Sequence, residues 1–165
     1  MTDPTLAEQV LNHGRQNGIL IATAESCTGG MVIAALTDIP GSSDVVDRGF
    51  VTYTNRAKIE MLGIRPETLA AHGAVSEEIA AEMAAGALVH SSAGLAVSIT
   101  GIAGPGGSEH KPEGRVCFGI ATAGSRATTE TVEFGAIGRG QVRIAARDHA
   151  LRLLLAALGQ MPPRP

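Results

Sequence analysis

The sequence is poor in aromatic residues and in charge of either sign. Aromatic side chains make up 2% of the 165 residues, with one tyrosine, three phenylalanines and no tryptophan, whereas glycine occurs 21 times. A core without large rings must be filled by aliphatic side chains, and glycine lets backbone segments lie close together. Because hydrophobic residues still make up 44% and charged residues only 18%, the composition excludes a disordered chain.

Three further absences disfavour whole classes of protein. Thirteen Lys and Arg against sixteen Asp and Glu give a net charge of −3, and the basic residues are scattered, so broad nucleic-acid binding is not expected. The longest apolar runs, such as 151–158, are far shorter than the roughly 20 residues that span a bilayer, and no signal peptide begins the chain. Cys27 and Cys117 belong to no CxxC or Cys/His spacing, which indicates reduced thiols. We therefore expect a soluble cytoplasmic protein that binds neither nucleic acid nor membrane.

Hydrophobic periodicity predicts helices and strands that alternate at first and end in a strand pair. The predicted helices cover about 6–17, 31–39, 55–62 with Asn55 as its cap, 77–90 and 140–158. The predicted strands cover 19–22, 45–54, 95–100, 115–123 and 127–134, with Gly124 and Ser125 as a two-residue hairpin turn and 161–165 as a frayed tail. This order implies a three-layer α/β/α fold with a mixed central sheet. The length is that of one domain, 1–165, with its core at about 6–158.

Two glycine-rich segments follow predicted strands. The segment 25–30, Glu-Ser-Cys-Thr-Gly-Gly, leads into a helix, and the segment 101–107 follows the strand at 95–100. Ligands of such sheets bind beyond the carboxyl ends of the strands, so we expect the functional site there. The segment 101–107 lacks the Lys-Ser/Thr of a P-loop. Two interpretations of it remain: a generic anion-binding nest or a surface loop.

Ser26 has two interpretations from its position. It can be a nucleophile at a strand-to-helix turn, where the N–H groups of 27–30 would hold an oxyanion or a phosphate. It can instead cap the helix, which is the commoner role of such a serine. The adjacent Cys27 is a competing nucleophile, because a thiol at a helix N-terminus has a lowered pKa. The residues alone do not decide between Ser26 and Cys27.

A serine nucleophile needs a base, and the chain offers few. The five histidines fall in predicted helices or loops with no acid placed beside them and no metal-binding spacing, so neither a Ser/His/Asp triad nor a zinc site is indicated. Lys58 and Lys111 are the only lysines, and Lys58 follows the only tyrosine, Tyr53, by five residues. Lys58 is either a base deprotonated by burial or a solvated helix lysine. Tyr53 either relays a proton and orients the lysine or is a half-buried strand residue.

The ordered set of motifs resembles the C-terminal domain of the competence/damage-inducible CinA proteins. The motifs are Ala24-Glu25-Ser26-Cys27-Thr28-Gly29-Gly30, Tyr53-Thr54-Asn55 with Lys58, Gly73-Ala74-Val75-Ser76, Thr100 to Gly107, and Lys111-Pro112-Glu113-Gly114. The resemblance covers about 6–158. Members of this family include stand-alone nicotinamide-nucleotide amidohydrolases, which hydrolyse the carboxamide of nicotinamide mononucleotide to nicotinate mononucleotide and ammonia.

The resemblance implies roles for particular residues of this chain. Ser26 would be the nucleophile, Lys58 its base, and Tyr53 a proton-relay or orienting group, with no metal and no cofactor. The residues implied in substrate binding are Thr28, Gly29, Gly30, Thr100, Gly101 and Arg139. The family usually has Gly-Asp-Arg where this chain has Ile137-Gly138-Arg139.

The resemblance also implies a pyridine nucleotide as the small-molecule partner and a homodimer as the assembly. An alternative function is a non-catalytic module that senses a nucleotide or binds a partner in competence or the DNA-damage response. A second alternative is an amidohydrolase that acts on a different small metabolite. An assay of ammonia release separates these alternatives.

Overall fold

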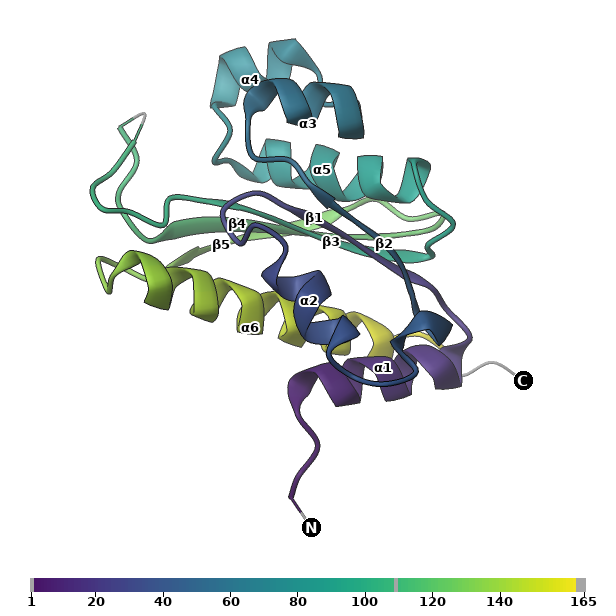
Figure 1. Ribbon diagram of the computed structural model, residues 1–165. Helices are drawn as coiled ribbons and strands as arrows, with labels where there is room; N and C mark the ends of the chain where they lie inside the picture. Colours follow the sequence, from purple (N-terminus) through teal and green to yellow (C-terminus); the bar gives the residue numbers. More distant parts are fainter. Residues whose placement is uncertain (1, 109, 163–165) are drawn as a thin grey trace.

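The computed structural model describes residues 2–108 and 110–162, so 163–165 of the expected tail lie outside the described residues. A five-stranded sheet lies between two layers of helices (Figure 1), which confirms the predicted fold class. The strands are β1 (Ile21–Glu25), β2 (Val46–Val51), β3 (Leu95–Gly101), β4 (Arg115–Thr122) and β5 (Thr128–Glu133). The helices are α1 (Leu6–Asn17), α2 (Met31–Thr37), the short 3-10 helix η1 (Ser42–Asp44), α3 (Asn55–Leu62), α4 (Pro66–His72), α5 (Glu77–Val89) and α6 (Arg139–Gly159).

The sheet combines parallel and antiparallel pairs in the order β2-β1-β3-β4-β5. Strand β1 pairs in parallel with β2 and β3, whereas β4 pairs antiparallel with both β3 and β5. In this register Glu25 of β1 lies beside Val51 of β2 and Ile99 of β3. The carboxyl ends of β1, β2 and β3 therefore meet at one edge of the sheet, and the segments that follow them are brought together.

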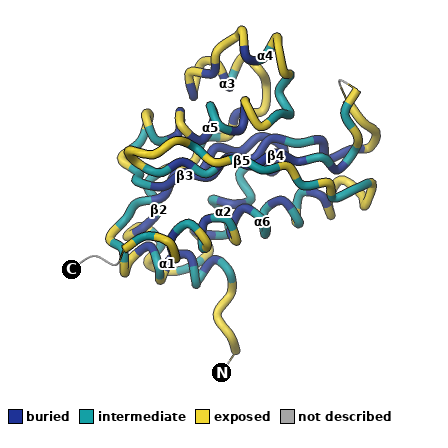
Figure 2. Tube along the Cα trace, turned by 180° about the vertical axis from the view of Figure 1, so that it is seen from behind, coloured by how far each residue is buried: buried dark blue, intermediate teal, exposed yellow. Residues whose placement is uncertain are grey.

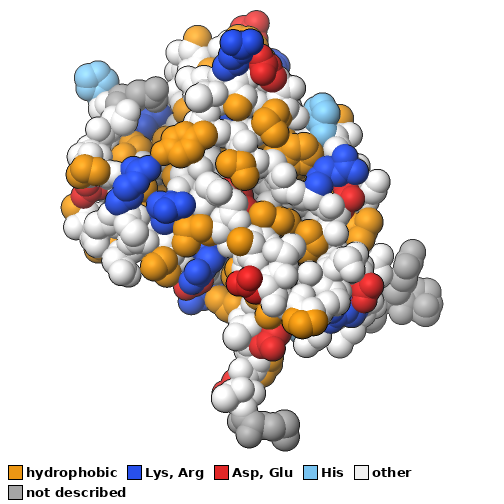
Figure 3. Space-filling model, in the orientation of Figure 1, with side chains coloured by type: hydrophobic (Ala, Val, Ile, Leu, Met, Phe, Trp, Pro, Cys, Tyr) orange, Lys and Arg blue, Asp and Glu red, His pale blue; other side chains and the backbone are white. Residues whose placement is uncertain are grey.

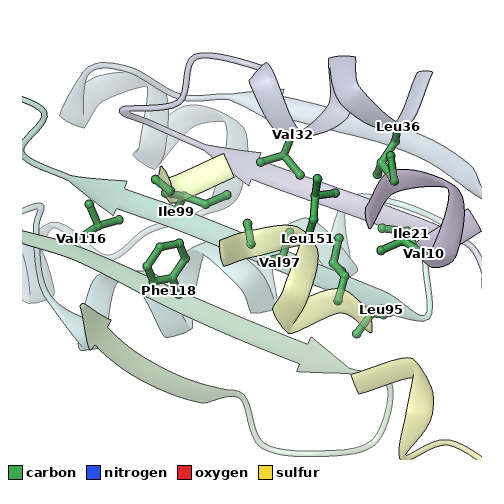
Figure 4. Packing of buried hydrophobic residues seen from close by; sticks show 14 of the residues in the cluster. Val10, Ile21, Val32, Leu36, Leu95, Val97, Ile99, Val116, Phe118 and Leu151 are labelled. Atoms are coloured by element: carbon green, nitrogen blue, oxygen red, sulfur yellow. The ribbon is translucent and has the colours of Figure 1, made fainter. Parts of the chain in front are cut away.

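The two faces of the sheet are covered by different helices. Helices α1, α2 and α6 lie on one face, and α5 lies on the other with α3 and α4 packed on its outer side (Figure 1). The larger apolar cluster lies under the first face, where Val97 and Ile99 of β3 and Phe118 of β4 pack against side chains of α2 and α6 (Figure 4). The central strands are accordingly buried along most of their length (Figure 2).

Glycine determines how closely α3 approaches α5. A Cβ atom at Gly86 of α5 would collide with the backbone carbonyl of Leu62 in α3. Any side chain at this position would push α3 outward. Because α3 carries Lys58, this close packing also sets how deeply that lysine enters the protein.

Several predicted boundaries are wrong, and each error has a local cause. Strand β1 runs from Ile21 to Glu25 rather than over 19–22, because the polar residues Thr23 and Glu25 are buried along with its apolar ones. Strand β2 ends at Val51, before the predicted end at residue 54. Helix α3 is capped by Thr54, whose hydroxyl accepts from the N–H of Ala57 at 3.0 Å, and not by Asn55.

Two connections also differ from the prediction. Helix α4 was not predicted from the sequence. Pro66 is its first residue, a position where proline is favourable, so this proline begins a helix. Five residues, 123–127, join β4 to β5 in place of the two-residue turn. Gly124 has φ 78° in this connection, and the N–H of Ser125 donates to the carbonyl of Thr122 at 3.2 Å. The apolar Ala123 and Ala127 continue the strand pattern in sequence but lie in the turn.

Charged side chains of both signs are intermingled on the surface. On the face seen in Figure 3, basic and acidic side chains lie near one another in several places. Arg56 pairs with Glu60 at 2.6 Å, and Arg65 lies 3.6 Å from Glu82. Within residues 2–108 and 110–162, none of the helices has both the length and the apolar character needed to cross a bilayer.

Candidate active site

Ser26 lies at the end of β1, in a turn that precedes α2. Its N–H donates to the carbonyl of Ile99 at 2.9 Å, which continues the pairing of β1 with β3. Helix α2 begins only at Met31, and its N-cap is Gly30, with φ 104° and no side-chain cap. Ser26 therefore does not cap the helix, and the capping interpretation is wrong. Its hydroxyl is left to face Lys58.

A buried carboxylate takes the place of that cap. Glu25 is fully buried. Its carboxylate accepts hydrogen bonds from the Thr23 hydroxyl (3.3 Å), the Thr28 hydroxyl (2.7 Å), the Val32 N–H (2.9 Å) and the Ile33 N–H (3.1 Å). A carboxylate is favourable at the N-terminus of a helix, where backbone N–H groups lack partners. Glu25 thus joins the start of α2 to the turn that carries Ser26, a role that the sequence analysis missed although an acid just before a helix is a known signal.

Lys58 is the buried base candidate. Its side chain enters from α3, is 1% exposed, and places Nζ 3.0 Å from Oγ of Ser26. Nζ also donates to the backbone carbonyls of Thr52 at 3.1 Å and Tyr53 at 3.4 Å. The ion pairs among the described residues do not include Lys58, and its burial lowers the pKa of the amine below that of a free lysine. The interpretation as a solvated helix lysine is therefore wrong.

The thiol of Cys27 has a raised pKa, whereas its position before a helix suggested a lowered one. Burial and, to a lesser extent, the nearby carboxylate of Glu25 raise the pKa of this thiol to about 12. The helix dipole does not offset this, because α2 begins four residues beyond Cys27. The thiol is protonated at neutral pH and is a poor nucleophile there.

Tyr53 and Arg139 lie at the mouth of the site. Tyr53 follows β2 in a loop and is 60% exposed, so it is not a half-buried strand residue. Its hydroxyl accepts from Nη2 of Arg139 at 2.8 Å, and Nη1 of Arg139 donates to the carbonyl of Gly104 at 2.6 Å. Tyr53 contacts Lys58 through its backbone carbonyl, and its phenol faces Arg139 instead.

A cavity of about 300 Å³ brings most of the candidate residues together. It is lined by Ser26, Cys27, Tyr53, Asn55, Lys58, Ala74, Val75, Thr100, residues 101–108 and Arg139. The hydroxyl of Thr100 donates to the carbonyl of Ala74 at 2.7 Å, so Thr100 connects two walls of the cavity. Thr28, Gly29 and Gly30 do not line it. Thr28 is buried behind Ser26, where its hydroxyl binds Glu25.

The glycine-rich loop after β3 is held in place by hydrogen bonds. The N–H of Gly106 donates to the carboxylate of Glu113 at 2.5 Å, and the N–H of Ile102 donates to the carbonyl of Arg115 at 2.9 Å. Gly104 has φ 90°, a conformation that favours glycine, and a Cβ there would collide with Glu113. The loop therefore forms a wall of defined shape next to Ser26.

Other candidates from the sequence lie elsewhere. Nζ of Lys111 binds the backbone carbonyls of His72 and Val75, each at 2.6 Å, and does not line the cavity. His149 pairs with Glu130 at 2.7 Å, away from Ser26. Among the described residues, no histidine lines the cavity, and no cluster of three His, Cys, Asp or Glu side chains could hold a metal ion.

Arg143, on the second turn of α6, is a further residue that holds the turn of Ser26 and that no sequence pattern indicated. Its Nε donates to the backbone carbonyl of Cys27 at 3.0 Å, and its Nη2 donates to that of Thr28 at 3.3 Å. The turn that carries Ser26 is thus held by Glu25 on one side and by Arg143 on another. No sequence signal could have identified Arg143, because it lies more than a hundred residues from the turn.

Known proteins share both the sequence and the fold. The profile of the family described as the CinA C-terminal domain matches residues 3–158. The nicotinamide-nucleotide amidohydrolase PncC of Escherichia coli strain K12 is 52% identical over 158 residues, which cover 93% of this chain and 95% of PncC. A CinA-like protein of Chloroherpeton thalassium is 56% identical over 139 residues, and the match spans 82% of this chain but only 33% of that protein. The crystal structure of the competence/damage inducible protein CihA from Agrobacterium tumefaciens superposes with a TM-score of 0.89 at 47% identity, covering 97% of this chain and 99% of the other.

Proposed function

This chain belongs to the CinA C-terminal domain family, and from that premise we propose that it is a nicotinamide-nucleotide amidohydrolase, which converts nicotinamide mononucleotide to nicotinate mononucleotide and ammonia. The observation that carries the proposal is the 3.0 Å contact between Ser26 Oγ and Nζ of a buried lysine, inside a cavity. The near full-length similarity to PncC supports this reaction as well.

Nζ of Lys58 donates to three acceptors, as an ammonium does, and the same positions can serve the neutral amine that burial favours. A neutral amine has two N–H hydrogens and one lone pair. The carbonyls of Thr52 and Tyr53 can accept the two hydrogens, which leaves the lone pair for the hydroxyl hydrogen of Ser26. Lys58 is then placed to remove the proton of Ser26 as the hydroxyl attacks.

The proposed reaction proceeds through an acyl-enzyme. Ser26 Oγ bonds to the carboxamide carbon as its proton passes to Lys58, and Lys58 returns that proton to the departing ammonia. Water then attacks the ester with Lys58 again as base, which releases the carboxylate product and restores Ser26. The N–H of Cys27, next to the nucleophile, donates to no backbone carbonyl among the described residues and is our candidate donor to the oxyanion.

Substrate recognition is assigned to the mouth and walls of the same cavity. The guanidinium of Arg139 is suited to the phosphate of a mononucleotide. Tyr53 orients Arg139 through its hydroxyl and supports Lys58 through its carbonyl. Thr100 and Gly101 would contact the rest of the nucleotide, while Thr28, Gly29 and Gly30 would act from behind Ser26 by shaping its turn. The homodimer and the cytoplasmic location stay predictions of the sequence and its resemblance.

The rate of ammonia release is expected to fall as the pH drops through the pKa of Lys58. Burial lowers this pKa, and the protonated form, which predominates below it, has no lone pair to accept the proton of Ser26. The acid limb of kcat/KM against pH should therefore lie below the value of about 10.4 for a free lysine. A pH profile at constant ionic strength checks this, and a limb at the ordinary lysine value would contradict it.

The proposed function is tested by ammonia release from the wild-type protein. Nicotinamide mononucleotide should yield ammonia and nicotinate mononucleotide in equal amounts, whereas nicotinate mononucleotide, which has no amide, serves as the control. Binding without ammonia release would favour the nucleotide-sensing module. Hydrolysis of other small amides in place of pyridine nucleotides would favour the second enzyme alternative.

A further inference from the structure

The N-terminal part of α6 contacts all three segments that follow the parallel strands. Arg139 and Arg143 are four residues apart, so they lie on the same side of the helix. Arg139 binds Tyr53, after β2, and the carbonyl of Gly104, after β3. Arg143 binds the turn after β1, through the carbonyls of Cys27 and Thr28. The proposed mechanism gives Arg139 a role but leaves Arg143 without one.

The contacts of Arg143 lead directly to Ser26. A peptide group is planar and trans, so its C=O and N–H point in opposite directions, and fixing one fixes the other. Arg143 holds the carbonyl of Thr28, and the N–H of the same peptide group, which belongs to Gly29, donates to the carbonyl of Ser26 at 3.0 Å. A hydrogen bond to the carbonyl of a peptide also strengthens its N–H as a donor.

The turn needs such support because two of its residues are glycines. Gly29 has φ 58° and Gly30 has φ 104°, and glycine restricts backbone rotation less than any other residue. Nη2 of Arg143 lies directly over Gly29, 3.4 Å from where a Cβ atom would be. On another side Glu25 holds the hydroxyl of Thr28 at 2.7 Å. Thr28 is thus held through its side chain by Glu25, and through its carbonyl by Arg143 together with the N–H of Met31 at 3.1 Å.

We propose that Arg143 is a positioning residue for Ser26, which orients the peptide groups of the turn and thereby keeps Oγ of Ser26 in line with Lys58. Arg143 does not line the cavity, so the proposal gives it no contact with the substrate. The inference rests on the proposed function only in taking Ser26 as the nucleophile. It goes beyond that function because it assigns the reactivity of Ser26 to a side chain on α6.

The test uses a serine-directed fluorophosphonate probe, whose reaction does not depend on the natural substrate. Ser26 Oγ bonds to phosphorus as the P–F bond breaks, fluoride leaves, and Lys58 takes the proton of Ser26. Labelling is followed by mass spectrometry in the wild type, Arg143→Gln, Arg143→Lys, Arg143→Ala, Ser26→Ala and the matched control Arg147→Gln. Arg147 lies one turn further along α6 and pairs with Asp148 at 2.9 Å. The rate constant reports the reactivity of Ser26, and the final labelled fraction reports how much protein is folded.

We expect Arg143→Gln to be labelled about 100-fold more slowly than the wild type, because a misplaced reacting group loses about that factor. The final labelled fraction should be unchanged, and Arg147→Gln should react like the wild type. Arg143→Lys should be intermediate, because an ammonium can hold one carbonyl but lacks the two-pronged geometry of the guanidinium. Millimolar guanidinium, far below denaturing concentrations, should partly restore Arg143→Ala but not Ser26→Ala.

If Arg143→Gln were labelled at the wild-type rate, the proposal would be overturned. With a full final labelled fraction, Arg143 would be dispensable. With a smaller final labelled fraction, Arg143 would only stabilise the fold. Failure of the wild type to be labelled at Ser26 would overturn the proposal as well. If the labelling rates differ as expected but the wild type releases no ammonia from nicotinamide mononucleotide, the positioning role stands and the proposed function fails. The two proposals are therefore distinguishable in one set of proteins.

Discussion

Replacement of Ser26 by alanine is expected to abolish ammonia release from nicotinamide mononucleotide, with a loss of kcat on the order of 10⁴–10⁶. The substitution removes the Oγ atom that Lys58 contacts at 3.0 Å, so no acyl-enzyme can form. It deletes one oxygen from a side chain at the cavity wall, and the free energy of unfolding should change by only about 1 kcal/mol. Steady-state ammonia assays and thermal unfolding of the same preparation measure both effects.

The two cysteines provide the contrast for this variant. Cys117→Ala is the matched control: Cys117 is a buried residue outside the cavity, and its replacement should leave kcat close to that of the wild type. Cys27 is adjacent to Ser26, but burial keeps its thiol protonated at neutral pH. If Ser26→Ala retained activity while Cys27→Ala lost it, the nucleophile would be the cysteine and our assignment would be wrong.

Replacement of Lys58 by methionine is expected to prevent acylation of Ser26. General-base catalysis by itself contributes about 10²–10⁴ in rate, and the loss should reach at least the upper part of that range because the described residues offer no second base in the cavity. Methionine has a similar length and no charge, so it fits the buried position of Lys58. Loss of activity should therefore occur without loss of the fold, as measured by acyl-enzyme formation and by denaturant unfolding.

The same variant has a second, pH-dependent consequence. Because burial lowers the pKa of Lys58 in the folded protein, the unfolded chain binds more protons between the folded and unfolded pKa values. The free energy of unfolding of the wild type should therefore rise with pH across this window, and Lys58→Met should lose that rise.

The variant Lys58→Arg distinguishes a requirement for a base at this position from a requirement for a positive charge. Arginine keeps the positive charge but stays protonated in proteins, so this variant should be inactive as well. If Lys58→Arg remained active, the site would need a cation next to Ser26 and no proton acceptor, which would contradict the proposed mechanism.

Much of the site could be predicted because the chemistry lies in short segments at the ends of strands. Ser26 and Tyr53 follow parallel strands, and Lys58 lies in the first turn of the helix after one of them. Parallel strands place their carboxyl ends at one edge of the sheet. The scarcity of lysine narrowed the choice of base to two residues. The motifs that carry the family resemblance lie in these same segments.

What the sequence could not predict depends on the burial of a side chain and on its contacts with residues distant in the chain. The pKa of Cys27 was expected to be low because a helix follows, but the pKa depends on burial, which is a property of the packed protein. The hydroxyl of Tyr53 meets Arg139, which is 86 residues away in the chain, and no local pattern predicts this partner. Glu25 was taken as part of a motif, although its carboxylate holds the helix start that a capping Ser26 would have held.

By itself the sequence determined the class of fold, the edge of the sheet where the site lies, and the family with its nucleophile and base candidates. The fold class and the sheet edge follow from local periodicity, whereas the family and its candidates follow from the resemblance of the ordered motifs. Only the tertiary structure decided that Lys58 is buried with Nζ at Ser26, that Cys27 is protonated, and that Glu25 and Arg143 hold the turn. Burial and contacts between distant segments exist only when α3, α6 and the sheet have packed together, and they set both the pKa values and the geometry on which the proposed chemistry depends.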